Sequence, residues 1–197
     1  MSRKAQLITV VVSIACLVGV LVPASASAAR PAFDGSCELS GIARFGHPVT
    51  NDVEPNRGKF RSQPGLGNCL GTLSIGDRVF EGTQWPVRAR ARATGEFSCL
   101  TGSLGGRASV VFLDGDGKPL RAHGRKVRIR AVIAMAHAVA AGSIEFAGAK
   151  GSSAGGTYNF TPSLGAVAGC AEGGDESLPM TVRYSTRGKL VSLGRRR

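Results

Sequence analysis

Three arginines alternate with small apolar residues in the stretch VRARARA, residues 87–93. Side chains of a β-strand point alternately to its two faces, so a strand here would place Arg88, Arg90 and Arg92 in one row. Successive members of such a row lie about 7 Å apart. Guanidinium groups bind phosphate and carboxylate oxygens through paired N–H donors. The stretch therefore predicts a cationic strand face that could hold an anionic ligand.

A second basic stretch, GRKVRIR, covers residues 124–130 and repeats the alternation. Together the two stretches supply the candidate polyanion-binding residues, which are Arg88, Arg90, Arg92, Arg125, Lys126, Arg128 and Arg130. The plainer interpretation is that exposed strand positions must be polar, and that arginine discourages pairing between sheet edges. Like charges directly opposite each other on paired strands destabilise a sheet unless an anion lies between them. The sequence does not say whether the two rows are neighbours.

The first 29 residues have the order of a secretory signal peptide, with a basic start, an apolar run over 5–22 and small residues before the mature chain. Cleavage is expected after Ala28 or Ala29. An uncleaved anchor or a lipoprotein acylated at Cys16 are the alternatives, although the apolar run continues past that cysteine. No later segment is apolar enough to cross a membrane. We therefore expect a secreted, extracellular protein, with association to the cell envelope as an option.

Positive charge is the strongest feature of the composition, with 25 Lys and Arg against 13 Asp and Glu. Loss of Arg3 and Lys4 with the leader lowers the net charge from +12 to +10. Such a field attracts anionic wall polymers, lipid headgroups, acidic polysaccharides or extracellular nucleic acid, although a biased composition alone could also produce it. Aromatic residues make up only 6% of the chain, too few to alternate with the cations as stacking platforms for bases. Sequence-specific nucleic-acid recognition is therefore not expected.

Four cysteines follow the leader, and they are Cys37, Cys69, Cys99 and Cys170. An even number in an exported chain predicts two disulfides. Three pairings are possible, and order along the chain alone favours Cys37 with Cys69 and Cys99 with Cys170. The cysteines stand singly rather than in C-x-x-C pairs, so the sequence predicts no metal site.

Turn signals such as PNRG, SIGD and LDGDGKP recur between short alternating runs, which is typical of all-β proteins. We expect an antiparallel β-sandwich or flattened β-barrel over 30–190, followed by a basic disordered tail over 191–197. The Ala-rich run 131–141 is ambiguous. Its alternation favours a strand, whereas a short helix over about 132–140 would also fit.

The sequence contains only weak matches to known catalytic motifs. GSSAG, residues 151–155, matches G-x-S-x-G with Ser153 as nucleophile, but that motif requires a following helix and a later histidine. His47, His123 and His137 all precede it. The DGDG stretch at 114–117 lacks the remaining ligands of a calcium loop and suits a hairpin better. The sequence predicts no catalytic residue, no metal and no cofactor, and hence a protein that is not an enzyme.

Four glycine-containing motifs occur in order, namely FDGSCELSG, GLGNCLGTL, FSCLTGSLGG and SIEFAGAKGSSAGGTYNFTP. In this order the chain resembles a group of secreted, glycine-rich β proteins of high-GC actinobacteria, over Phe33 to about Val182. The resemblance implies an exported, disulfide-bearing β domain, and it brings no catalytic residue or ligand with it. The Ala-rich run departs from the pattern of the group.

Two hypotheses for function follow. The first is an exported, non-enzymatic protein that binds an anionic extracellular or cell-wall polymer through its cationic strand face. The second is a secreted inhibitor or protein-interaction module that uses the polar, proline-bearing segment 51–67 as a disulfide-supported loop, since long loops of small domains are often functional. Polyanion binding should weaken with added salt, whereas capture of a protein by the loop should not.

Overall fold

The structure is a computed structural model that describes residues 30–50, 56–63, 65–98, 100–138, 141–160 and 175–194. Its elements are β1 (Ala32–Val49), β2 (Asn56–Ser62), β3 (Gly65–Ile75), β4 (Arg78–Phe97), β5 (Thr101–Phe112), β6 (Arg121–Ala122), β7 (Arg125–Lys126), β8 (Arg128–Ala138), β9 (Ala141–Ala147), the 3-10 turn η1 (Ala149–Gly151), β10 (Ser153–Phe160), β11 (Asp175–Thr186) and β12 (Leu190–Val191). In this described part of the chain there is no α-helix. The expected all-β class is confirmed.

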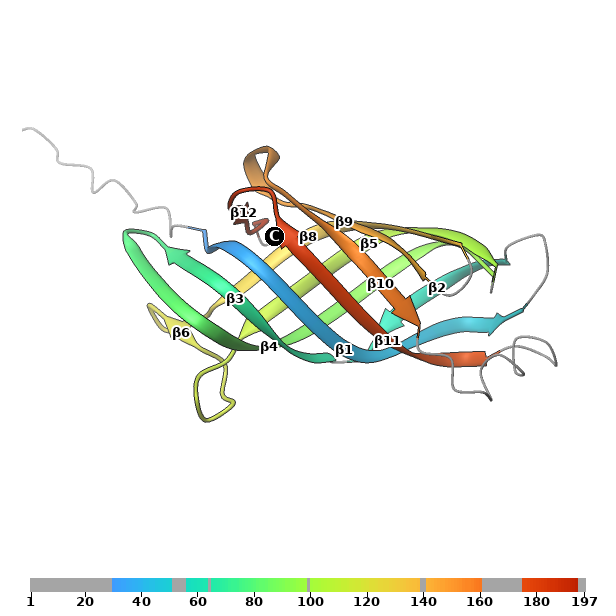
Figure 1. Cartoon of the computed structure of the whole chain (residues 1–197), viewed down its shortest axis with the longest axis horizontal. Helices are drawn as coiled ribbons and strands as arrows, with labels where there is room; N and C mark the ends of the chain where they lie inside the picture. Colours follow the sequence, from blue (N-terminus) through green and yellow to red (C-terminus); the bar gives the residue numbers. More distant parts are fainter. Residues whose placement is uncertain are drawn as a thin grey trace, which may run out of the picture.

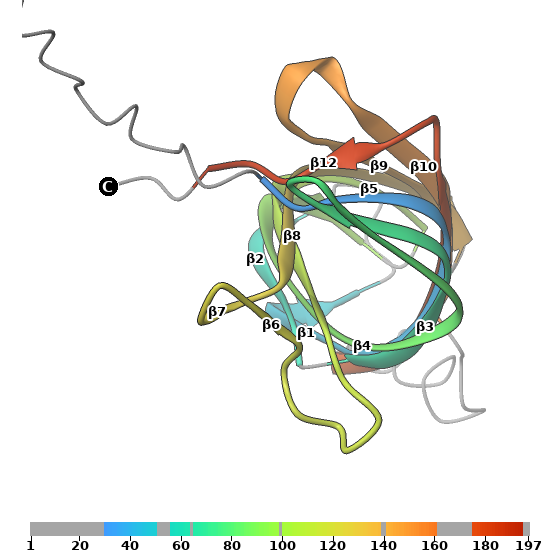
Figure 2. The same cartoon turned by 90° about the vertical axis from the view of Figure 1, so that its left-hand side faces the viewer.

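The strands close into an antiparallel barrel (Figures 1 and 2). From β4 onward, each main strand pairs with the next one along the chain, in the order β4, β5, β8, β9, β10 and β11, and β11 pairs back onto β1. β2 and β3 both lie between β1 and β4, at different levels, so they share one position in the wall. The barrel therefore has eight strand positions. Of the two architectures that the sequence allowed, the structure has the barrel.

A β-bulge separates β2 from β3. Phe45 of β1 lies opposite Phe60, and Ser40 lies opposite Leu66, so five residues along β1 correspond to six along its partner. The extra residue changes which positions face inward, because side chains alternate across a strand. At the bulge, the Ser62 hydroxyl accepts a hydrogen bond from the backbone N–H of Ala91 at 2.6 Å. This side chain satisfies a donor where the regular pairing is interrupted.

The prediction of a long loop over 51–67 is wrong for most of its length. Residues 56–62 form β2, and 65–67 begin β3, while residues 51–55 and 64 lie outside the described part. Phe60 is the one large apolar residue in β2 and is buried in the core. A single buried residue among arginine, lysine and glycine gives little apolar alternation, which explains why the sequence suggested a loop. Pairing with both β1 and β4 fixes the segment as a strand.

Apolar side chains fill the barrel. Near one end, the Phe45 ring contacts those of Phe60, Phe97 and Phe160, with ring centroids 4.6 to 6.0 Å apart. Between the two ends lies an apolar cavity of about 50 Å³. Pockets for small molecules usually measure about 300–1,000 Å³. The interior is therefore a packed core, and recognition of a ligand has to be sought on the outer surface.

The disulfide Cys37–Cys69 joins directly opposite positions of β1 and β3, and both residues are buried. This confirms the first predicted pairing. Cys99 and Cys170 lie outside the described residues, so the second pairing stays a prediction. The same holds for the leader over 1–29.

The structure decides between strand and helix for the Ala-rich run, and it corrects the bounds of the expected C-terminal tail. The Ala-rich run forms strands β8 and β9 rather than a helix, apart from residues 139–140, which are not described. At the C-terminus, β12 pairs with the start of β1, and Ser192 is buried against β8. Residues 191–194 therefore belong to the folded domain, and of the expected tail only 195–197 remain outside the described part. No described segment forms a helix long and apolar enough to span a membrane.

Candidate anion-binding face

The alternation at 87–93 lies in β4 as the sequence predicts. Arg88, Arg90 and Arg92 are exposed on the outer surface of the barrel, whereas Val87 and Ala93 are buried in its core. The barrel needs small or apolar residues on the inner side of this strand and tolerates long charged ones outside. The row along β4 is therefore accessible to a ligand.

A second alignment of arginines runs across the strands. Arg92 of β4 lies directly opposite Arg107 of β5 and, on its other side, directly opposite Arg61 of β2. Arg61 in turn lies directly opposite Arg44 of β1. We call these four residues the arginine row, and all four are exposed. Neighbouring strands are about 4.8 Å apart, so the row extends about 14 Å around the barrel wall.

Further cations surround the arginine row on the same outer surface. Residues Arg57 and Lys59 of β2 and Arg88 and Arg90 of β4 join it, and we call the eight residues together the arginine face. Glu96, opposite Arg57, is the one carboxylate at the outward positions of the described stretches 40–46, 57–61, 88–96 and 103–111. No described carboxylate forms an ion pair with a member of the arginine row. The face is therefore strongly cationic.

This arrangement costs stability when no anion is bound. Like charges directly opposite on paired strands destabilise a sheet by roughly 0.2–1 kcal/mol per pair, and the arginine row contains three such pairs. The side chains reduce the repulsion by spreading apart and by keeping their charges in water. An anionic group between two arginines would convert the repulsion into two charge-assisted contacts. An opposed row of arginines therefore becomes favourable when an anion lies between its members.

The remaining predicted cations lie elsewhere. β5 separates β4 from β8, so Val111 stands between Arg88 and Arg128, and Ser109 stands between Arg90 and Arg130. Arg128 and Arg130 are only half-exposed, and the C-terminal segment is hydrogen-bonded to their backbone. The two predicted rows are therefore not neighbours.

Arg125 and Lys126 belong to β7, in a separate two-stranded sheet with β6, and both are exposed. They contribute positive charge away from the arginine row. The sequence analysis missed Arg44, Arg61 and Arg107 because only the strand register brings them beside Arg92. The alternation of Lys59 and Arg61 was the one available signal, and it was hidden in the segment predicted to be a loop.

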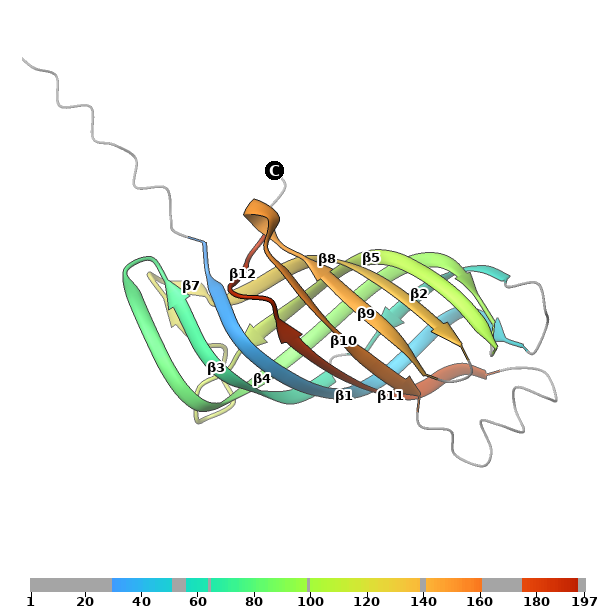
Figure 3. The ribbon, with the colours of Figure 1, turned by 45° about the horizontal axis from the view of Figure 1, so that its top comes forward.

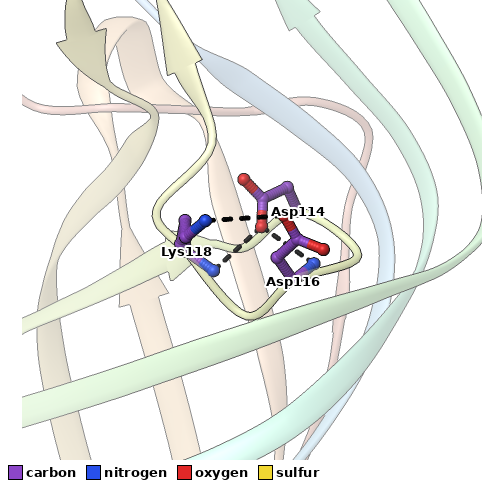
Figure 4. A network of polar contacts seen from close by, with 3 residues as sticks. All are labelled: Asp114, Asp116 and Lys118. Atoms are coloured by element: carbon purple, nitrogen blue, oxygen red, sulfur yellow. Dashed lines mark hydrogen bonds and ion pairs between the residues drawn. The ribbon is translucent and has the colours of Figure 1, made fainter.

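The two other motifs with possible chemistry are structural. The Asp114 carboxylate accepts hydrogen bonds from the backbone N–H groups of Asp116 and Lys118, at 3.1 and 2.8 Å, which closes the turn as Figure 4 shows. The Lys118 ammonium lies 3.6 Å from the Asp116 carboxylate. Ser153 begins strand β10, whereas the nucleophile motif requires a helix after the serine. The described residues contain no group of three or more His, Cys, Asp or Glu side chains placed to hold a metal ion.

Comparison of this chain with protein-family models, curated proteins and solved structures finds no match. The resemblance to secreted actinobacterial β proteins therefore stays a prediction. A function has to be argued from the geometry and charge of the barrel surface.

Proposed function

We propose that the protein is an exported, non-catalytic binding protein that holds an anionic polymer on its arginine face. The observation that carries this proposal is the arginine row, in which three pairs of arginines are directly opposed with no described carboxylate between them. A sheet gains nothing from such pairs by itself. A bound polyanion supplies the missing opposite charge.

The chemistry of the face favours phosphate, sulfate or carboxylate groups carried on a chain. Each guanidinium can donate two parallel hydrogen bonds to such a group. No aromatic side chain stands at the outward positions of the face, so stacking on bases is not part of the recognition. Binding by charge alone tolerates variation in the backbone of the polymer, and it releases counterions.

The Cys37–Cys69 disulfide supports an oxidising compartment outside the cytoplasm, where such bonds persist. The expected leader over 1–29 agrees with export. The polymers available there are acidic polysaccharides, anionic wall polymers and released nucleic acid. We place the protein among these, either free or associated with the envelope.

The test compares two variants with the same net charge. The row variant carries Arg44→Gln, Arg61→Gln, Arg92→Gln and Arg107→Gln. The control variant removes four exposed cations from other parts of the surface through Arg121→Gln, Arg125→Gln, Lys126→Gln and Lys189→Gln. Affinity for heparin and for single-stranded DNA is measured by titration calorimetry over a series of salt concentrations.

The row variant should lose most of its affinity, and the slope of log affinity against log salt should fall by about 3 to 4, close to one per lost contact. The control variant should bind nearly as tightly as the wild type. Equal loss in both variants would show that net charge alone attracts the polymer. Tight wild-type binding that salt does not weaken would contradict the proposal.

A further inference from the structure

A second hollow lies on the outer surface over β3, β1, β11 and β10, and Gln84 of β4 also lines it. The strands β3, β1, β11 and β10 are consecutive in the wall (Figure 3). The volume of the hollow is about 630 Å³, within the usual range for sites that bind small molecules. We call it the outer groove. It shares β1 and β4 with the arginine face, but no residue of its lining belongs to that face, and β11 and β10 lie on the other side of β1. It therefore offers a surface that the proposed function does not use.

An ion pair lies in the middle of the groove. Glu38 of β1 is directly opposite Arg183 of β11, and their carboxylate and guanidinium are 2.9 Å apart. The Arg183 guanidinium donates a hydrogen bond to the Glu38 carboxylate, which raises the pKa of Arg183. Asn68 lies opposite Glu38, and Thr157 lies opposite Arg183. A row of directly opposed residues across these four neighbouring strands thus carries an amide, a carboxylate, a guanidinium and a hydroxyl.

The rest of the lining is uncharged and combines polar side chains with glycines and the apolar Leu70. Six hydroxyl and amide side chains line the groove, namely Ser36, Ser40, Asn68, Gln84, Thr157 and Ser185. Glu38 and Arg183 are its charged residues, and their charges cancel. The outer groove is therefore neutral and rich in groups that both donate and accept hydrogen bonds, in contrast to the arginine face.

Three glycines line the groove, namely Gly67, Gly155 and Gly156. Gly155 stands at an outward position of β10, and a side chain there would meet only the flexible end of Arg187, at 3.2 Å. At Gly67 and Gly156, a Cβ atom would overlap the backbone oxygens of the neighbouring strand. These two positions, opposite the buried Leu39 and Tyr184, accept no other residue without a shift of the strands. Gly155 is thus the glycine that leaves room on the outer side of the wall.

We propose that the outer groove binds a neutral saccharide chain. Sugar hydroxyls donate and accept hydrogen bonds, as do the serine, threonine and amide side chains that line it. The Glu38 carboxylate can accept from one sugar hydroxyl while the Arg183 guanidinium donates to the next. Leu70, 54% exposed beside Ser36, offers an apolar surface to the C–H face of a sugar ring. A neutral lining gives no attraction to a polyanion, so the ligand class differs from that of the arginine face.

The test uses four neutral hexasaccharides as probes, namely cellohexaose, chitohexaose, maltohexaose and mannohexaose. Affinity is measured by titration calorimetry at about 0.05 M and about 0.5 M salt. Two variants fill the groove from different strands, Gly155→Val in β10 and Ser185→Val in β11. Ser103→Val, at an exposed position of β5 outside both the groove and the arginine face, is the matched control, and thermal unfolding verifies that every variant folds.

We expect at least one probe to bind with a dissociation constant of about 1 mM or tighter, equally at both salt concentrations. Each filling variant that folds should bind at least about tenfold more weakly, and the control should bind like the wild type. Failure of all four probes to bind at millimolar concentration would overturn the proposal. Unchanged affinity in both filling variants would overturn it as well, because the sugar would then occupy another surface. Neither result affects the salt-dependent binding expected of the arginine face.

Discussion

Arg92, like Arg61, has an arginine directly opposite it on both neighbouring strands. It is directly opposed to Arg61 on one side and to Arg107 on the other, and it is exposed. Each opposed pair costs roughly 0.2–1 kcal/mol, so Arg92→Gln should stabilise the unliganded protein by about 0.4–2 kcal/mol at low salt. For a domain of this size, that corresponds to a rise in Tm of about 1–8 °C.

The assay is thermal unfolding at about 0.01 M and about 1 M salt, where the Debye length is about 30 Å and about 3 Å. Screening should remove most of the gain at high salt. Arg183→Gln is the matched control, because it removes an arginine that has an ion-pair partner, Glu38. It should leave Tm unchanged or lower it at low salt.

A decrease in Tm for Arg92→Gln at low salt would refute the reasoning, since it would mean that the charge is already compensated. An equal increase at both salt concentrations would refute it too, because the cause would then be packing or strand propensity. The predicted result would show that the protein carries a folding cost at a surface where ligand binding would recover it.

Three further predictions test the fold. Replacing Cys37 and Cys69 together by serine should lower the free energy of unfolding in urea by about 2–4 kcal/mol, because their disulfide spans 32 residues. Gly106→Ala should destabilise the protein by more than about 2 kcal/mol, since the new methyl would overlap backbone atoms of β4, whereas Gly105→Ala next to it has open space and should be neutral or stabilising. Burial raises the pKa of the Tyr184 phenol, so the folded state keeps its proton while the unfolded chain ionises above pH about 10. The free energy of unfolding should therefore fall as the pH rises above about 10, and Tyr184→Phe should make the fall shallower by up to about 1.4 kcal/mol per pH unit.

Local patterns in the sequence were sufficient for part of this structure. The alternation at 87–93 placed the arginines of β4 outside, and order along the chain paired Cys37 with Cys69. The first prediction depends on the two-residue period of a single strand, and the second depends on the proximity of two cysteines in the sequence. The strand over 131–138 was favoured by the same two-residue period.

The strand register and the closure of the barrel depend on contacts between residues far apart in the sequence. No local pattern could therefore predict them. The arginine row exists because Arg44, Arg61, Arg92 and Arg107 share one level across four strands, and a shift of one residue in any pairing would dissolve it. The bulge between β2 and β3 makes such a shift at one point of the wall. The outer groove depends on the pairing of β1 with β11, whose pairs join residues about 130 to 150 positions apart. No pattern within a single strand reports on either feature.

Closure of the barrel also limits what can occupy the arginine face. The arginine row spans three of the eight steps around the wall, so in a round barrel Arg44 and Arg107 point in directions that differ by roughly 135°. A flat surface, such as a lipid bilayer, can therefore meet only part of the row at once, whereas a flexible chain can follow the curve and reach all four residues. Arg44→Gln and Arg107→Gln should each weaken binding of heparin by a similar factor, and together by the product of the two. With vesicles of anionic lipid, at most one of these two changes should matter. Additive loss on vesicles, with no loss on heparin, would show that the face docks on membranes and would contradict the proposed polymer.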